Sequence, residues 1–120
     1  MADRVMLITW GENIAGREEH GLEVFNDAIG LYGRMQQAGR IESFDVAILS
    51  PNARLDGYIL VRGSAEQLAA LREDEEYIRN MVDATLVVKE LAVSDGYVGN
   101  GLAKQIEVYR EAISKVPQHA

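Results

Sequence analysis

Residues 41–62, IESFDVAILSPNARLDGYILVR, contain two short apolar runs separated by a turn. The first run, Ile41 to Leu49, has the alternating pattern of a strand, and Ser50-Pro51-Asn52 ends it. The second run extends from Gly57 to about Arg62. The segment therefore predicts two antiparallel strands joined by a hairpin loop. In the first strand, one face holds Phe44, Val46 and Ile48, and the other holds Ser43, Asp45, Ala47 and Leu49.

A strand and a helix precede this hairpin. Arg4 to Trp10 is a short apolar run rich in strand-forming residues. From Arg17 to Ala38, apolar residues recur with the spacing of an amphipathic helix. Gly39 is the expected residue after the helix, because glycine readily adopts the left-handed conformation that closes many helices. The apolar face predicted for this helix contains Leu22, Phe25, Ile29 and Tyr32.

The same pattern of helix and strand returns after the hairpin. Ser64 and Gln67 have the spacing of a capping box, so a second helix starts there. The acidic run Glu73 to Glu76 interrupts its apolar face and indicates a break between two helical pieces. Leu86 to about Val98 is predicted as a fourth strand of unusual length. A last helix is expected from Leu102 to Val116, with an apolar stripe of Leu102, Ile106, Tyr109, Ile113 and Val116.

The order strand, helix, strand, strand, helix, strand predicts a ferredoxin-like α+β fold with a four-stranded antiparallel sheet. Right-handed crossovers place both helices on one sheet face. We expect a single domain over residues 1–120, with residues 102–116 as an added C-terminal helix. The other sheet face is also predicted to be apolar, with Val5, Leu7, Ile59, Val61, Val87, Leu91 and Val93 on it.

An apolar sheet face of this size needs a cover. A second copy related by a two-fold axis is the simplest one, so we predict a homodimer through the sheet face. The long fourth strand would then reach the partner's second strand.

The element order from Arg4 to about Val98 resembles the dimeric α/β-barrel superfamily. This superfamily includes antibiotic-biosynthesis-monooxygenase-like, muconolactone-isomerase-like and YciI-like proteins and several uncharacterised families. The resemblance implies a barrel formed by two ferredoxin-like sheets, and it rests on element order and strand length. Cofactor-independent oxygenases that resemble this fold hold their substrate with polar and aromatic pocket residues. No catalytic motif of theirs aligns with this chain.

The composition limits the classes of function. The 120 residues carry a net charge of −7 and no cluster of Lys and Arg, which argues against nucleic-acid binding. The absence of cysteine excludes thiol nucleophiles and disulfide scaffolds. No apolar run is long enough for a signal peptide or a membrane span, so we expect a cytoplasmic protein with no membrane partner.

Three polar residues form the candidate catalytic set: His20, Asp45 and Arg62. His20 could act as a general base near neutral pH, or it could be a solvated helix residue. Asp45 lies in an otherwise apolar strand, where a buried carboxylate needs a partner such as Arg62 on the next strand. Alternatively, Asp45 is a charge on a sheet edge that discourages the addition of another strand, and Arg62 is an ordinary cation at the end of a strand.

Three aromatic residues, Trp10, Tyr58 and Tyr97, are the candidate ligand-binding residues for a planar molecule. The alternative is packing in the core or in a dimer interface. The segment Gly96 to Gly101 lacks the order of a nucleotide-binding loop and is predicted as a turn in which Asn100 caps the last helix. The second histidine, His119, lies in the C-terminal tail, and His20 has no partner at metal-ligand spacing. We therefore predict neither a metal nor a cofactor.

Three classes of function remain open, because this fold hosts all of them. The first is a cofactor-independent small-molecule enzyme of the oxygenase, isomerase or lyase type, in which His20, Asp45 or Arg62 lines a closed pocket. The second is a non-catalytic ligand-binding or sensing module with a pocket of Trp10, Tyr58 and aliphatic residues. The third is a structural or interaction protein that uses the apolar stripe of the last helix.

Overall fold

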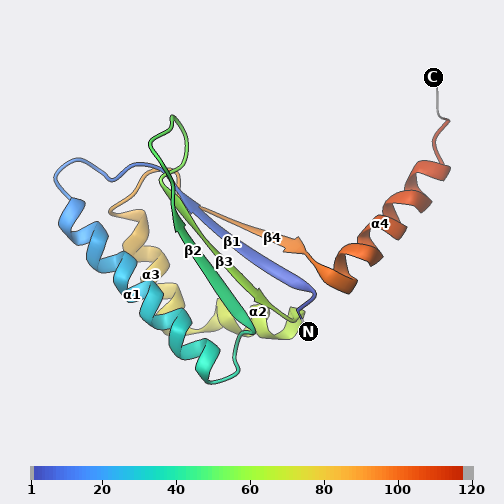
Figure 1. The fold of residues 1–120 in the computed structure, drawn as a ribbon, viewed down its shortest axis with the longest axis horizontal. Coiled ribbons are helices and arrows are strands. Elements are labelled where there is room, and N and C mark those ends of the chain that lie inside the picture. The colour runs from blue at the N-terminus through green and yellow to red at the C-terminus, as the bar shows by residue number, and fades with distance from the viewer. Residues whose placement is uncertain (1, 118–120) are drawn as a thin grey trace.

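The computed structural model of the protein describes residues 2–117 (Figure 1), so the tail residue His119 lies outside the described residues. The strands form one antiparallel sheet with the order β2-β3-β1-β4, which confirms the predicted ferredoxin-like topology. The elements are β1 (Arg4–Trp10), α1 (Glu18–Gln37), β2 (Ser43–Ile48), β3 (Gly57–Gly63), α2 (Ala65–Glu73), α3 (Glu75–Thr85), β4 (Ala92–Tyr97) and α4 (Gly99–Ser114).

Helices α1, α2 and α3 cover one face of the sheet, and the core lies between these two layers (Figure 1). Because side chains alternate along a strand, every second residue of the central strands points into this core. Met6 and Ile8 of β1 and Ile59 and Val61 of β3 are buried there. Helix α1 contributes Ala28, Leu31, Tyr32 and Met35 to the same core.

The opposite, helix-free face differs from the prediction. Ile59, Val61 and Val87 were assigned to it, but all three are buried on the helix side of the sheet, and Leu91 and Val93 pack against the same core. The reason is the antiparallel register, which pairs Leu7 with Leu60 and thereby puts even-numbered β3 residues opposite odd-numbered β1 residues. The open sheet face consists of Val5, Leu7, Thr9, Ser43, Asp45, Ala47, Tyr58, Leu60, Arg62, Ala92, Ser94 and Gly96.

The fourth strand is shorter than predicted. Strand β4 has six residues, and the predicted start at Leu86 was wrong because Leu86 is the C-cap of α3. Val87 is buried, Val88 forms an isolated bridge to Asn13, and Glu90 has a positive φ of 57° that breaks any continuous strand. The short β4 therefore gives no support to the prediction that the fourth strand reaches the partner's second strand.

The helix boundaries follow the sequence signals closely. Gly39 has a φ of 71°, as expected after α1, and Ser64 and Gln67 form the predicted capping box. The acidic run separates α2 from α3, and Asp74 caps α3. The apolar face of α1 is rotated from the predicted one, because Leu22 is 60% exposed. None of the helices in residues 2–117 combines the length and the apolar character needed to cross a membrane.

Helix α4 projects away from the rest of the chain (Figure 1). It starts earlier than predicted, with Val98 as its N-cap, so Asn100 lies inside the helix and does not cap it. Its N-terminal end contacts the body, where the amide of the N-cap residue Val98 donates to the Asp3 carbonyl at 3.2 Å. The predicted stripe is largely exposed, with Ile106 at 46% and Tyr109 at 67%.

Candidate ligand-binding cavity

A cavity of about 620 Å³ lies between the sheet and the helix pair α1 and α3. This volume is within the range of small-molecule sites. The cavity extends over the end of β1 and the start of β3, and the loop between β2 and β3 and the link between α3 and β4 complete its rim. Its lining is Ile8, Trp10, Asn13, Glu18, Gly21, Leu22, Val24, Phe25, Ala28, Tyr32, Ile48, Leu49, Pro51, Asn52, Asp56, Ile59, Asn80, Met81, Ala84, Val87, Val88 and Leu91.

The wall of the cavity is mostly apolar. Trp10 and Phe25 meet edge to face, with ring centroids 5.8 Å apart and an interplanar angle of 61°. Gly21 lets α1 approach the segment after β1, since a Cβ there would lie 2.5 Å from Asn13 Oδ1. An apolar surface of this kind favours a ligand with an apolar body.

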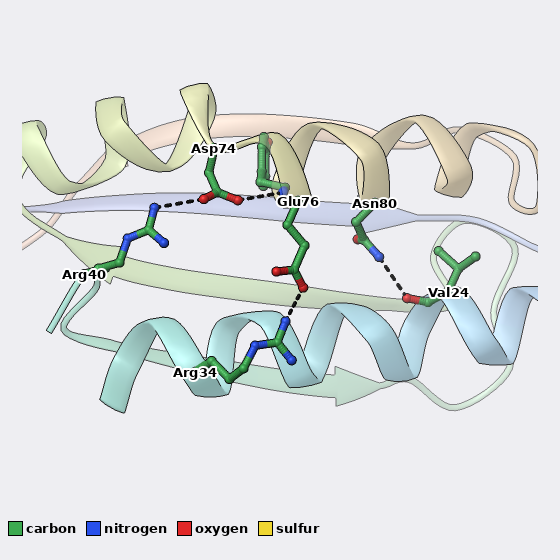
Figure 2. A network of polar contacts seen from close by, with 7 residues as sticks. Val24, Arg34, Arg40, Asp74, Glu76 and Asn80 are labelled. Carbon is green, nitrogen blue, oxygen red and sulfur yellow. Dashed lines mark hydrogen bonds and ion pairs between the residues drawn. The ribbon is translucent and has the colours of Figure 1, made fainter. Parts of the chain in front are cut away.

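Polar contacts join α1 and the loop that follows it to α3 (Figure 2). Asn80 Nδ2 of α3 donates to the Val24 carbonyl of α1 at 3.1 Å, and Arg34 of α1 pairs with Glu76 of α3. Arg40, in the loop between α1 and β2, donates to Asp74 at 2.9 Å. The backbone N–H of Tyr77 and then Arg40 lower the pKa of Asp74 below its ordinary value. These contacts fix α1 relative to α3.

The inner end of the cavity is formed by Tyr32. Its side chain is buried, and in the described part of the chain its hydroxyl has no hydrogen-bond partner. Burial raises the pKa of Tyr32 above its ordinary value, and Tyr77 adds to this shift. The hydroxyl therefore stays protonated at neutral pH and is not a general base.

The rim carries the polar side chains Asn13, Glu18, Asn52 and Asp56. Asn52 is committed to its own turn, where its Nδ2 donates to the Leu55 carbonyl at 2.7 Å and its Oδ1 accepts from two backbone amides. The sequence analysis missed this rim, because its residues come from separate loops and a helix start that only the fold brings together. The turn residues at 50–52 were the only local signal.

The structure places the three predicted aromatic residues apart. Trp10 lines the cavity, and its ligand-binding role stays a prediction. Tyr58 lies on the open sheet face, and Tyr97 lies on β4, where the Arg4 guanidinium is 4.7 Å from its ring centroid. A ligand in this cavity would therefore contact Trp10 and not the two tyrosines.

The three predicted catalytic residues also lie outside the cavity. His20 is on the exposed side of α1, with Nδ1 3.3 Å from Glu23 Oε2. Asp45 and Arg62 are paired as predicted, and Arg62 Nη1 donates to Asp45 Oδ2 at 2.5 Å on the open sheet face. Their catalytic role stays a prediction, and it would require a site other than this cavity. In residues 2–117, no group of three or more His, Asp or Glu side chains is placed to hold a metal ion.

Comparison with solved structures identifies the architecture. A dimeric ferredoxin-like protein of unknown function from Jannaschia has a TM-score of 0.64 at 13% identity, over 79% of this chain and 98% of that one. The chain has a ferredoxin-like fold. A second dimeric protein of unknown function with this fold, from Bacteroides fragilis, has a TM-score of 0.60 at 12% identity, over 79% of this chain and 96% of that one. No family model and no curated protein matches the sequence.

A candidate antibiotic biosynthesis monooxygenase from Chloroflexus aurantiacus has a TM-score of 0.51 at 14% identity, over 80% of this chain and 94% of that one. The resemblance stated from element order is therefore confirmed for the fold.

Proposed function

We propose that the protein is a homodimeric small-molecule-binding protein with one cavity in each copy. The cavity between the sheet, α1 and α3 carries the proposal, since it joins an apolar wall to a polar rim. Asn80, which lines the cavity, joins α3 to the Val24 carbonyl of α1 beside this space. We place the protein in the cytoplasm, which fits a chain without cysteine.

An enzyme of the cofactor-independent oxygenase, isomerase or lyase type is the catalytic form of this proposal. The likeness to the Chloroflexus protein supports testing oxygenation first. Such an enzyme would use the polar groups of the cavity itself, Asn13, Glu18 and Asp56, because the set of His20, Asp45 and Arg62 lies elsewhere. An enzyme and a non-catalytic binding or sensing module both have to bind a ligand. Ligand binding is therefore the property to test first.

The charge distribution bears on which face a homodimer would use. Residues 99–116 hold three basic and two acidic residues, so the rest of the chain has 9 − 17 = −8. Two such bodies repel each other over most of their surfaces. The open sheet face is close to neutral, because its two charged residues, Asp45 and Arg62, form an ion pair. We therefore propose that the copies meet through this face. The Jannaschia and Bacteroides proteins are themselves described as dimeric.

The single tryptophan offers a direct test of ligand binding, because Trp10 lines the cavity. Titration with 2-phenylethanol, a neutral aromatic probe, should give a saturable change in Trp10 fluorescence. Ala28→Leu should abolish the change by filling the cavity, whereas Ala69→Leu on exposed α2 surface should keep it. No saturable change in the parent protein, or an equal change in Ala28→Leu, would overturn the proposal. Thermal melts establish that both variants are folded.

A second candidate function, interaction through α4, is favoured by the exposure of Ile106 and Tyr109. The stripe recurs at alternating spacings of four and three, which is the seam pattern of two paired helices. Helix α4 also carries both signs of charge, with Lys104 and Arg110 beside Glu107 and Glu111. We therefore propose the α4 of a second copy as the occupant of this stripe.

A further inference from the structure

The rim of the cavity has only one sign of charge. Glu18 and Asp56 line it, and no Lys, Arg or His in residues 2–117 does. Neither carboxylate belongs to an ion pair within the described part of the chain. The net charge of −7 adds to the negative potential of the rim.

The two arginines nearest to these carboxylates in the sequence, Arg17 and Arg54, are not among the lining residues. Arg17 directs its guanidinium to the Leu86 carbonyl, with Nη1 at 2.5 Å, and it is not among the lining residues. Arg54 is exposed and also lies outside the lining. Glu18 and Glu19 occupy the first turn of α1, so the positive end of the helix dipole already faces carboxylates.

The hydrogen-bonding capacity of the rim points in the same direction. The side-chain amides of Asn52 and Asn80 donate to backbone carbonyls of the protein. Of the other rim residues, Glu18 and Asp56 only accept hydrogen bonds when ionised, and Asn13 is the remaining amide. The two carboxylates therefore favour a ligand head group that donates hydrogen bonds.

We infer that the cavity selects molecules with an apolar body and a hydrogen-bond-donating head group that is cationic or neutral, and that it disfavours carboxylates and phosphates. The inference rests on the proposed function, because it assigns a ligand class to the same cavity. The strongest ligands of this class are primary amines on an aromatic or aliphatic body. An amine keeps its charge at the rim beside Glu18 and Asp56, while its apolar body contacts the wall around Trp10.

A matched series of probes tests the selection: 2-phenylethylamine, 2-phenylethanol and 3-phenylpropanoate, each titrated against Trp10 fluorescence. We expect the amine to bind best, the alcohol next and the acid worst, with roughly tenfold between the first and the last. In Glu18→Gln/Asp56→Asn, the three affinities should agree within about twofold. A control variant, Glu107→Gln/Glu111→Gln on α4, changes the net charge equally and should keep the order.

The outcomes separate the two proposals. If no probe changes the fluorescence, the proposed function fails and the inference fails with it. If all three probes bind equally, or the acid binds best, the inference fails and ligand binding stands. The control variant could also remove the preference for the amine as fully as the rim variant does. That result would assign the preference to the net charge of the protein, and it too would overturn the inference.

Discussion

Glycine has opposite structural roles at two helical positions of this chain. A Cβ added at Gly33 in α1 would meet no atom within 4 Å. A Cβ at Gly101 in α4 would lie 2.2 Å from the Asp3 carbonyl oxygen, a distance that requires the backbone to move. Gly33 thus costs helix stability without a packing reason, whereas Gly101 allows α4 to start against the body.

We expect Gly33→Ala to raise the free energy of unfolding by about 0.5–1 kcal/mol, because alanine is the better helix former. Gly101→Ala should lower it despite the same propensity gain, since the new methyl group displaces α4 from Asp3. Urea denaturation measures both variants. Equal stabilisation by the two substitutions would show that the contact at Gly101 does not constrain the chain.

Asp74 links three parts of the helix layer, because it caps α3, ends α2 and accepts from Arg40. Asp74→Ala should lower the free energy of unfolding by about 1 kcal/mol near neutral pH through the lost cap. Asp74→Asn should lower it less, because asparagine is also a good N-cap.

The same carboxylate gives a pH dependence of defined sign. Its folded pKa lies below the ordinary value of 3.8, so its stabilising contribution is complete above that value and is lost as the pH falls through the folded pKa. The stability gap between the parent protein and Asp74→Ala should therefore narrow between neutral pH and about pH 3. A gap that widens on acidification would contradict this assignment. Urea denaturation at both pH values measures it.

Individual contacts could be predicted from the sequence where neighbouring strands bring the residues together. Asp45 and Arg62 are an example, since hairpin strands place them side by side. The rim of Asn13, Glu18 and Asp56 could not be predicted in this way. The spacing of these residues in the sequence does not show that the loops and the helix start that carry them lie side by side.

The elements differ in how well local patterns determine them. The acidic run predicted the break between α2 and α3, and in the structure Asp74 of this run caps α3 by accepting from the Tyr77 amide. The β-branched run after Leu86 misled the strand prediction, since burial of Val87 under the helices outweighed its strand propensity. The face of α1 was rotated for a similar reason, as small residues such as Gly21 and Ala28 let it approach the sheet.

Helix α4 provides the prediction for an isolated element. Under the second candidate function, Ile106→Asp places a charge in the seam between the α4 helices of two copies and should weaken association. Ala103→Asp, a neighbouring exposed position outside the stripe, adds the same charge and should leave association unchanged. Analytical ultracentrifugation over a concentration series measures the difference. Identical association constants for the two variants would exclude the stripe as an interface.

For the assembly as a whole, the open sheet face is the proposed interface, and its centre contains Leu7 and Leu60. Leu60→Asp should convert the dimer to a folded monomer, because an unpaired carboxylate would be buried in the interface while the core stays intact. Leu86→Asp, at an exposed site elsewhere, should remain dimeric. Light scattering after size exclusion measures both masses. A Leu60→Asp protein that stays dimeric would place the interface elsewhere.

The most direct test of a dimer with one ligand cavity per copy is native mass spectrometry of the protein with 2-phenylethylamine. The account predicts a species of 2 × 13.3 = 26.6 kDa that takes up as many as two probe molecules. The same spectrum recorded for Ala28→Leu should show the dimer without probe. A monomer of 13.3 kDa would contradict the interface, and a parent dimer that stays bare at saturating probe would contradict the cavity as a ligand site.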